Sequence, residues 1–221
     1  MADLSPAQLR TVASGIARAL DGLEIDYAIM GGAAVNLLLN DTSRQTEDMD
    51  LVIQVDERGI TADRLTMELV KTYPTEFGTI SQYGHHIPAY KLTQDSSEGE
   101  QTLVQLEIFD YESWPHRPQY NLEAASRETI KLNGQNVKVF SAAWLLREKL
   151  LSQYQRSGST KGISDIQDIS IISLFAMPGQ AELDFDANSE LIDALKNFLQ
   201  KRPDLEERLK QKIKCSAIFG N

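Results

Sequence analysis

The sequence predicts an α/β fold, with a mixed, twisted sheet and flanking helices in residues 1–140 and a helical C-terminal region in residues 141–221. Short β-rich runs alternate with helical apolar patterns over residues 24–73. Residues 75–140 contain short runs in which the residue character alternates with a period of two, and turn residues separate these runs. This pattern is typical of strands. From Ser141 onward the apolar residues recur mostly at helical spacing. We expect two domains, with the helical one completing a cleft.

The first elements follow from local signals. Ser5, Pro6 and Gln8 form a capping box with proline at the first helical position. After this helix, the pattern predicts a strand over residues 24–30, a turn at Gly31 and Gly32, an apolar helix from Ala33, a strand over 49–55 and a helix over 62–73.

The next elements are predicted as a β-meander over residues 75–110 and a hairpin over 128–140, whose Asn133-Gly134 pair favours a tight primed turn. His85 and His86 fall in a turn of the meander. We expect an exposed or packed pair there rather than a zinc site, with a substrate contact as the other reading. Four helices are predicted to follow, over residues 142–156, 164–176, 188–200 and 203–215.

Composition narrows the class of protein. The net charge of -10 would repel long nucleic acid, so a small or metal-bridged substrate fits better. No run approaches the roughly 20 apolar residues of a membrane-spanning helix. Cys215 is the single cysteine, which excludes internal disulfides and multi-cysteine zinc sites. Because the N-terminal segment is a structural helix rather than a targeting peptide, we expect a cytoplasmic protein.

The chemistry concentrates in residues 30–53, MGGAAVNLLLNDTSRQTEDMDLVI. Asp48 and Asp50 are two residues apart on a predicted strand, so their carboxylates project from the same face and form half of a site for Mg²⁺. The turn at Gly31 and Gly32 precedes a helix, and it would let a polyphosphate approach the backbone and the first helical amides. This stretch therefore predicts a metal-bound triphosphate.

The same stretch resembles the nucleotidyltransferase superfamily typified by DNA polymerase beta, and is most similar to the branch of minimal nucleotidyltransferases and AbiEii-type toxins. In that branch Arg-x-Thr or Arg-x-Ser precedes the aspartates, and Arg44 and Thr46 stand there. The resemblance implies the nucleotidyltransferase fold and a third acidic residue on a later strand. We choose Glu107, which lies between apolar residues, with Asp110 at the strand end as the alternative.

The resemblance also implies which residues bind nucleotide: Gly31, Gly32, Arg44, Thr46 and Lys149. Lys149 corresponds to a lysine on the first helix after the sheet. Asp165 and Asp168 correspond to an acidic position on the next helix, and Ser164 stands where the family commonly has a lysine. Two interpretations stay open for Arg44: its side chain contacts phosphate, or it pairs with Asp41 or Glu47. Thr46 either orients an aspartate or caps a turn.

The implied activity is transfer of a nucleoside monophosphate from a nucleoside triphosphate, taken as ATP, to a hydroxyl. Asp48, Asp50 and Glu107 would bind Mg²⁺, with Mn²⁺ as a substitute. The net charge favours a small-molecule acceptor. Transfer to a tRNA or a protein hydroxyl is the alternative, and would require a basic patch such as Lys149, Arg156 and Lys161. A non-catalytic nucleotide-binding module is a further alternative.

Overall fold

The computed structural model describes residues 3–39, 44–82, 84–93 and 101–220. The chain divides into two compact units, Met1–Phe140 and Ser141–Asn221. The first holds a sheet with helices, and the second is helical. No helix in the described ranges has both the length and the apolar character needed to cross a membrane.

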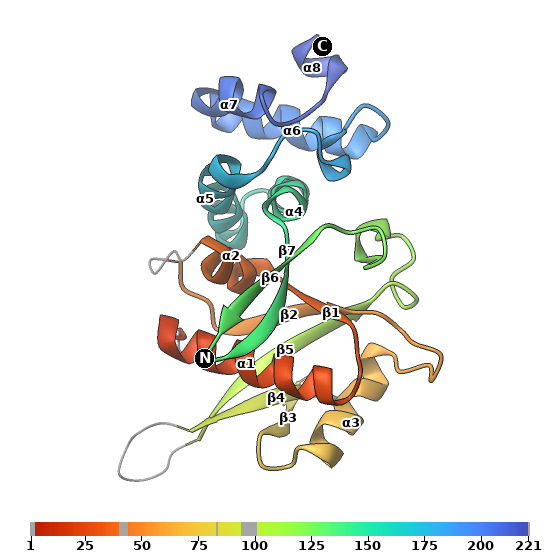
Figure 1. Ribbon diagram of the computed structural model, residues 1–221. Helices are drawn as coiled ribbons and strands as arrows, with labels where there is room; N and C mark the ends of the chain where they lie inside the picture. Colours follow the sequence, from red (N-terminus) through yellow and green to blue (C-terminus); the bar gives the residue numbers. More distant parts are fainter. Residues whose placement is uncertain (1–2, 40–43, 83, 94–100, 221) are drawn as a thin grey trace. The chain divides into compact units, whose positions relative to one another are not determined.

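The first unit is a mixed seven-stranded sheet of order β3-β4-β5-β2-β1-β7-β6 (Figure 1). The central strand β2 is antiparallel to β1 and parallel to β5, while β1 is parallel to β7. The strands are β1 (Tyr27–Met30), β2 (Asp48–Ile53), β3 (Phe77–Gln82), β4 (His85–Thr93), β5 (Gln101–Asp110), β6 (Arg127–Leu132) and β7 (Gln135–Phe140). The predicted α/β class with a mixed sheet is confirmed.

The two antiparallel parts of the sheet follow the sequence pattern. Strands β3, β4 and β5 form the predicted meander. Strands β6 and β7 form the predicted hairpin, in which Asn133 and Gly134 have φ angles of 49° and 82°, as a type I′ turn requires. Local turn chemistry therefore determined the β6–β7 connection.

Three helices flank the sheet: α1 (Pro6–Gly22), α2 (Gly31–Leu39) and α3 (Ala62–Thr72). Both hydrogen bonds of the predicted capping box at Ser5 are present. Helix α1 contacts β4, β6 and β7, and at Gly15 it approaches the sheet so closely that an added Cβ would lie 2.5 Å from the Tyr90 hydroxyl. Helix α3 contacts β3, β4 and β5.

Two local predictions for this unit are wrong. Helix α2 begins at Gly31, directly after β1, rather than at Ala33, because Gly31 adopts a φ of 69° and reverses the chain within one residue. His85 and His86 belong to β4 rather than to a turn, since their backbones pair with Gln82 and Ser81 of β3.

The second unit contains α4 (Ala142–Gln155), α5 (Thr160–Phe175), α6 (Ser189–Lys201), α7 (Glu206–Lys210) and α8 (Ser216–Phe219), with short 3-10 turns η2 (Ala181–Leu183) and η3 (Pro203–Leu205); a further 3-10 turn, η1 (Pro118–Tyr120), belongs to the first unit. Ser141, Ser159 and Asn188 cap α4, α5 and α6 with their side chains. Helix α4 packs against α5 and α6.

The helix predicted over residues 203–215 is wrong in extent. It is divided into η3 and α7, after which the chain leaves helical geometry. Lys214 instead forms a parallel bridge with Asp184, with its amide donating to the Leu183 carbonyl and its own carbonyl accepting from Phe185. This bridge buries the neighbours Ile213 and Cys215. Tertiary burial thus overrides the helical propensity of the segment.

Candidate active site

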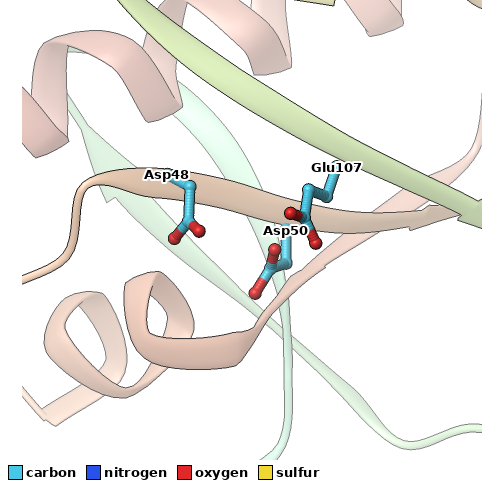
Figure 2. Close-up of side chains that lie close together, drawn as sticks. All are labelled: Asp48, Asp50 and Glu107. Carbon is cyan, nitrogen blue, oxygen red and sulfur yellow. The ribbon is translucent and has the colours of Figure 1, made fainter. Parts of the chain in front are cut away.

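Three carboxylates converge on one face of the sheet (Figure 2). Asp48 and Asp50 lie on β2, and Glu107 lies on β5 directly opposite Asp50 in the parallel register. Side chains alternate along a strand, so all three project from the same face, while Met49 between the aspartates is fully buried on the other. One carboxylate oxygen from each residue lies within 4.8 Å of the others. The structure therefore assembles the predicted acidic triad.

The donor set of this triad fits a hard divalent cation. All three ligand groups are carboxylates of intermediate exposure, and oxygen ligands are those that such cations prefer. At these separations each pair of negative charges repels by about 1 to 3 kcal/mol, depending on the local dielectric. A bound cation would convert this repulsion into attraction.

Gly31 is required where the triad meets the start of α2. Its φ of 69° lies in the left-handed region that residues with a Cβ avoid. A Cβ built at this position would lie 2.1 Å from Oδ2 of Asp50, far inside van der Waals contact. The glycine therefore provides the turn and, at the same time, the space in which the Asp50 carboxylate sits.

Arg44 lies against the second glycine of the turn. A Cβ at Gly32 would lie 2.7 Å from an Arg44 guanidinium nitrogen. The segment is held by the side-chain amide of Asn36, which donates to the Arg44 carbonyl at 2.6 Å, and the guanidinium donates to the Gln45 carbonyl. A positive charge is thereby placed at the glycine turn. The alternative partner Asp41 lies outside the described residues, and pairing with Glu47 stays a prediction.

Two uncharged residues form hydrogen bonds with carboxylates of the triad. The Thr46 hydroxyl lies 3.2 Å from Oδ1 of Asp48, as expected for a residue that orients an aspartate. Gln105 is 5% exposed and faces Asp48 across the β2–β5 pair, and its side-chain amide donates to Oε1 of Glu107 at 3.5 Å. Sequence reasoning missed Gln105, although its position two residues before Glu107 on a predicted strand placed it on the same face.

Asp110, the alternative to Glu107, has a different environment from the one predicted. It is fully buried rather than solvated. Its Oδ2 accepts hydrogen bonds from the Ala62 amide at the start of α3 and from the Ser113 hydroxyl, and its Oδ1 accepts from the Ser113 amide. Because it is three residues after Glu107, it projects from the opposite face of β5. Its contacts make it a structural anchor for α3.

Lys149 belongs to the second unit, on α4. Its ammonium lies 2.8 Å from Oδ1 of Asp165 and 2.7 Å from Oδ2 of Asp168, and all three side chains are at least nine-tenths buried. Arg156 approaches Asp165 at 3.7 Å from the end of the same helix. The structure thus joins the three residues that the resemblance singled out on α4 and α5 into one buried ion-pair cluster.

Comparison with known proteins identifies the family. The model of the family described as "Nucleotidyl transferase AbiEii toxin, Type IV TA system" matches residues 16–216, which is nearly the whole chain. The chain belongs to this AbiEii family. The resemblance inferred from residues 30–53 is therefore confirmed, and the protein is an enzyme of the nucleotidyltransferase class.

A solved structure of similar sequence supports this family, and a second one is also similar. An antigenic nucleotidyltransferase-like protein from Paracoccidioides brasiliensis is 57% identical, with a TM-score of 0.95 and coverage of 100% of both chains. The antibiotic-resistance factor ANT(2'')-Ia is 15% identical, with a TM-score of 0.47 and coverage of 90% of this chain and 95% of that one. No curated protein matches.

Proposed function

We propose that this AbiEii nucleotidyltransferase moves a nucleoside monophosphate from a nucleoside triphosphate, with ATP the first candidate, to a hydroxyl of a small molecule, with Mg²⁺ as cofactor and Mn²⁺ as a substitute. The observation that carries the proposal is the triad of Asp48, Asp50 and Glu107, seated against a glycine turn whose Gly31 leaves space for Asp50. A cytoplasmic setting fits the single, buried Cys215.

The residues of the candidate site would have different roles. Asp48, Asp50 and Glu107 would hold the cation, which when bound neutralises phosphate charge and favours the alkoxide form of the attacking hydroxyl. Gly31 and Gly32 let the triphosphate approach the first amides of α2. Arg44 and Thr46 border the same turn: Arg44 supplies positive charge to the phosphates, and Thr46 orients Asp48.

The reaction is a single displacement at phosphorus. The acceptor oxygen forms a bond to the α-phosphorus as the bond to pyrophosphate breaks, and the hydroxyl proton passes to Glu107 as general base. Preorganised positive charge and alignment of the two reactants provide most of the rate enhancement in phosphoryl transfer. The chain therefore contributes position and charge rather than a covalent intermediate.

A small acceptor is favoured over tRNA. The net charge of -10 opposes binding to a phosphate backbone. Of the residues considered for a basic patch, Lys149 is buried and paired with two aspartates, so its charge is already compensated. Toxin-like transfer to tRNA or a protein is the second candidate, and the family description as a toxin is its support. A role for Lys149 in nucleotide binding stays a prediction.

Thermal unfolding of the full chain with each of the four nucleoside triphosphates, with and without Mg²⁺ or Mn²⁺, tests nucleotide binding. We expect at least one nucleotide to raise the midpoint only when the metal is present, since a ligand that binds the folded state stabilises it. If no combination shifts the midpoint, nucleotide binding is excluded.

The Asp50→Asn variant tests the metal assignment. It removes one ligand and relieves repulsion, so the ligand-free midpoint should equal or exceed that of the wild type, while the metal-dependent shift disappears. Asp193→Asn, an exposed aspartate on α6, is the matched control and should retain the full shift. A normal shift in Asp50→Asn would show that the triad does not hold the metal.

A further inference from the structure

The strand that carries Glu107 continues into an apolar region on the same face of the sheet. Side chains alternate along β5, so Phe109, two residues after Glu107, projects from the face of the triad. Two residues of an extended strand span about 7 Å, which places Phe109 directly beside Glu107. Val52 of β2 pairs with Phe109, projects from the same face and is fully buried. The sheet face directly beyond the triad is therefore apolar.

The segment between β5 and β6 adds two rings to Phe109. The centre of the Tyr120 ring lies 5.5 Å from that of Phe109, and the indole of Trp114 lies 6.0 Å from it in an edge-to-face arrangement. Aromatic rings attract each other at such separations. Tyr120 is 7% exposed, whereas Trp114 is 43% exposed. Trp114 is thus the most accessible ring of this aromatic cluster of Phe109, Trp114 and Tyr120.

The turn that carries Trp114 is held by hydrogen bonds to the end of β5. The Trp114 amide donates to the carbonyls of Asp110 and Tyr111, both at 3.2 Å. The carboxylate of Asp110, buried on the other face of β5, also accepts from the amide and the hydroxyl of Ser113. Two successive residues of the strand therefore position the indole: Asp110 holds the turn, and Phe109 contacts the ring.

The aromatic cluster and the glycine turn lie on opposite sides of the triad along the strands. Strand β1 is antiparallel to β2 and reaches Gly31 directly after Met30, the partner of Asp50. Strand β5 is parallel to β2 and reaches Phe109 after Glu107, which also pairs with Asp50. Gly31 and Phe109 therefore lie in opposite directions from the level of Asp50.

This arrangement indicates which part of a reaction complex the cluster would contact. In an in-line displacement the attacking and the leaving oxygens lie on opposite sides of phosphorus. With pyrophosphate at the glycine turn, the acceptor approaches from the side of the aromatic cluster. The acceptor hydroxyl meets Glu107, so the adjoining part of the same molecule reaches Phe109 and Trp114.

We propose that Trp114 is an acceptor-binding residue, and that the acceptor carries a planar aromatic ring that stacks on the indole while one of its hydroxyl groups reaches Glu107. An aromatic ring matches an indole in shape and in charge distribution, because the π-face is negative and the ring edge is positive. The acceptor role rests on the proposed function, whereas binding of an aromatic ring at Trp114 does not.

Phenyl β-D-glucopyranoside and methyl β-D-glucopyranoside are matched probes, since both offer the same sugar hydroxyls and only the first carries an aromatic ring. Binding to the full chain is measured by ligand-observed NMR titration. We expect the phenyl glycoside to bind at least about fivefold more tightly, which is the lower end of the effect of one stacked base. Trp114→Ala should abolish this preference, and Trp114→Phe, which keeps a ring, should retain it. Met67→Ala is the matched control, because Met67 is 66% exposed on α3, across the sheet from the triad, and it should behave as the wild type.

Tryptophan fluorescence tests the same contact without a variant, so the test survives if Trp114→Ala fails to fold. The chain has two tryptophans, and Trp144 is 1% exposed, so acrylamide quenching of the folded protein reports on Trp114. We expect the phenyl glycoside to reduce this quenching and the methyl glycoside to leave it unchanged, because only a stacked ring covers the indole.

The proposal is overturned if the phenyl glycoside binds no better than the methyl glycoside, including the case in which neither binds. It is also overturned if a folded Trp114→Ala variant keeps the preference, or if bound phenyl glycoside leaves Trp114 open to quenching. Nucleotide-dependent thermal shifts report separately on the proposed function. Their absence from a wild type that binds the phenyl glycoside would remove the acceptor role and leave the ring-binding site.

Discussion

Replacement of Gly31 by alanine should damage the metal site more than the fold. A residue with a Cβ in the left-handed region costs about 1 to 2 kcal/mol, and Gly31 has a φ of 69°. For a chain of this size that corresponds to a decrease in unfolding midpoint of about 2 to 8 °C. The added Cβ would lie 2.1 Å from Oδ2 of Asp50, so that carboxylate has to move by about 1 Å to reach ordinary contact. Metal ligands tolerate displacements of only about 0.5 Å, so Mn²⁺ affinity should fall about 10- to 100-fold.

The assay is a Mn²⁺ titration of the full chain by calorimetry, together with the unfolding midpoint of each metal-free variant. Gly32→Ala is the matched control. Its Cβ would meet the guanidinium of Arg44, the far end of a flexible side chain that can move aside, so Mn²⁺ affinity should stay within about threefold of the wild type. Wild-type Mn²⁺ affinity in Gly31→Ala would refute the argument that this glycine makes room for Asp50.

Three further predictions test other parts of the chain. Gln105→Leu removes the donor to Glu107 and should weaken Mn²⁺ binding up to about tenfold without lowering the metal-free midpoint, while Gln101→Leu at the exposed start of the same strand should have no effect. Lys149→Met leaves two buried aspartates without their cation and should lower the free energy of unfolding in urea by about 3 to 5 kcal/mol; a change below about 1 kcal/mol would contradict the ion-pair assignment. Burial by itself raises the pKa of Asp26, but hydrogen bonds from two cationic neighbours outweigh this and hold that pKa below 3.8. The resulting stabilisation is present above the pKa of Asp26 in the unfolded state and is lost as the pH falls through its pKa in the folded state. The difference in unfolding midpoint between the wild type and Asp26→Asn should therefore shrink below pH 3.8. A pH-independent difference would contradict the pairing.

Several features of the protein could be predicted from short stretches of sequence because their causes are local. Strand alternation places Asp48 and Asp50 on one face, and the same rule applies wherever the strand lies in the sheet. The Asn133-Gly134 turn and the Ser5 cap depend on the conformational preferences of a few adjacent residues. The family is likewise identified by one contiguous segment, residues 30–53.

Other local predictions were wrong where backbone pairing with another segment competes with local preference. The helical pattern over residues 203–215 is interrupted because Lys214 pairs with Asp184, some thirty residues earlier. His86 was assigned to a turn, yet its backbone extends β4 by pairing with Ser81. In both segments, hydrogen bonds to a neighbouring part of the chain override the local signal.

The sequence by itself determined the α/β class, the family and the aspartate pair, because periodicity, turn chemistry and motif spacing are properties of contiguous residues. Only the tertiary structure decided what surrounds that pair. The parallel register of β2 and β5 brings Glu107 opposite Asp50 and Gln105 opposite Asp48, and it turns Asp110 toward the other face. The divergence of β4 from β5 leaves room for a pocket that is lined by residues of α3, β4 and β5. The β2–β5 pairs join residues more than fifty positions apart. All of these relations depend on how strands pair rather than on the preferences of any one segment.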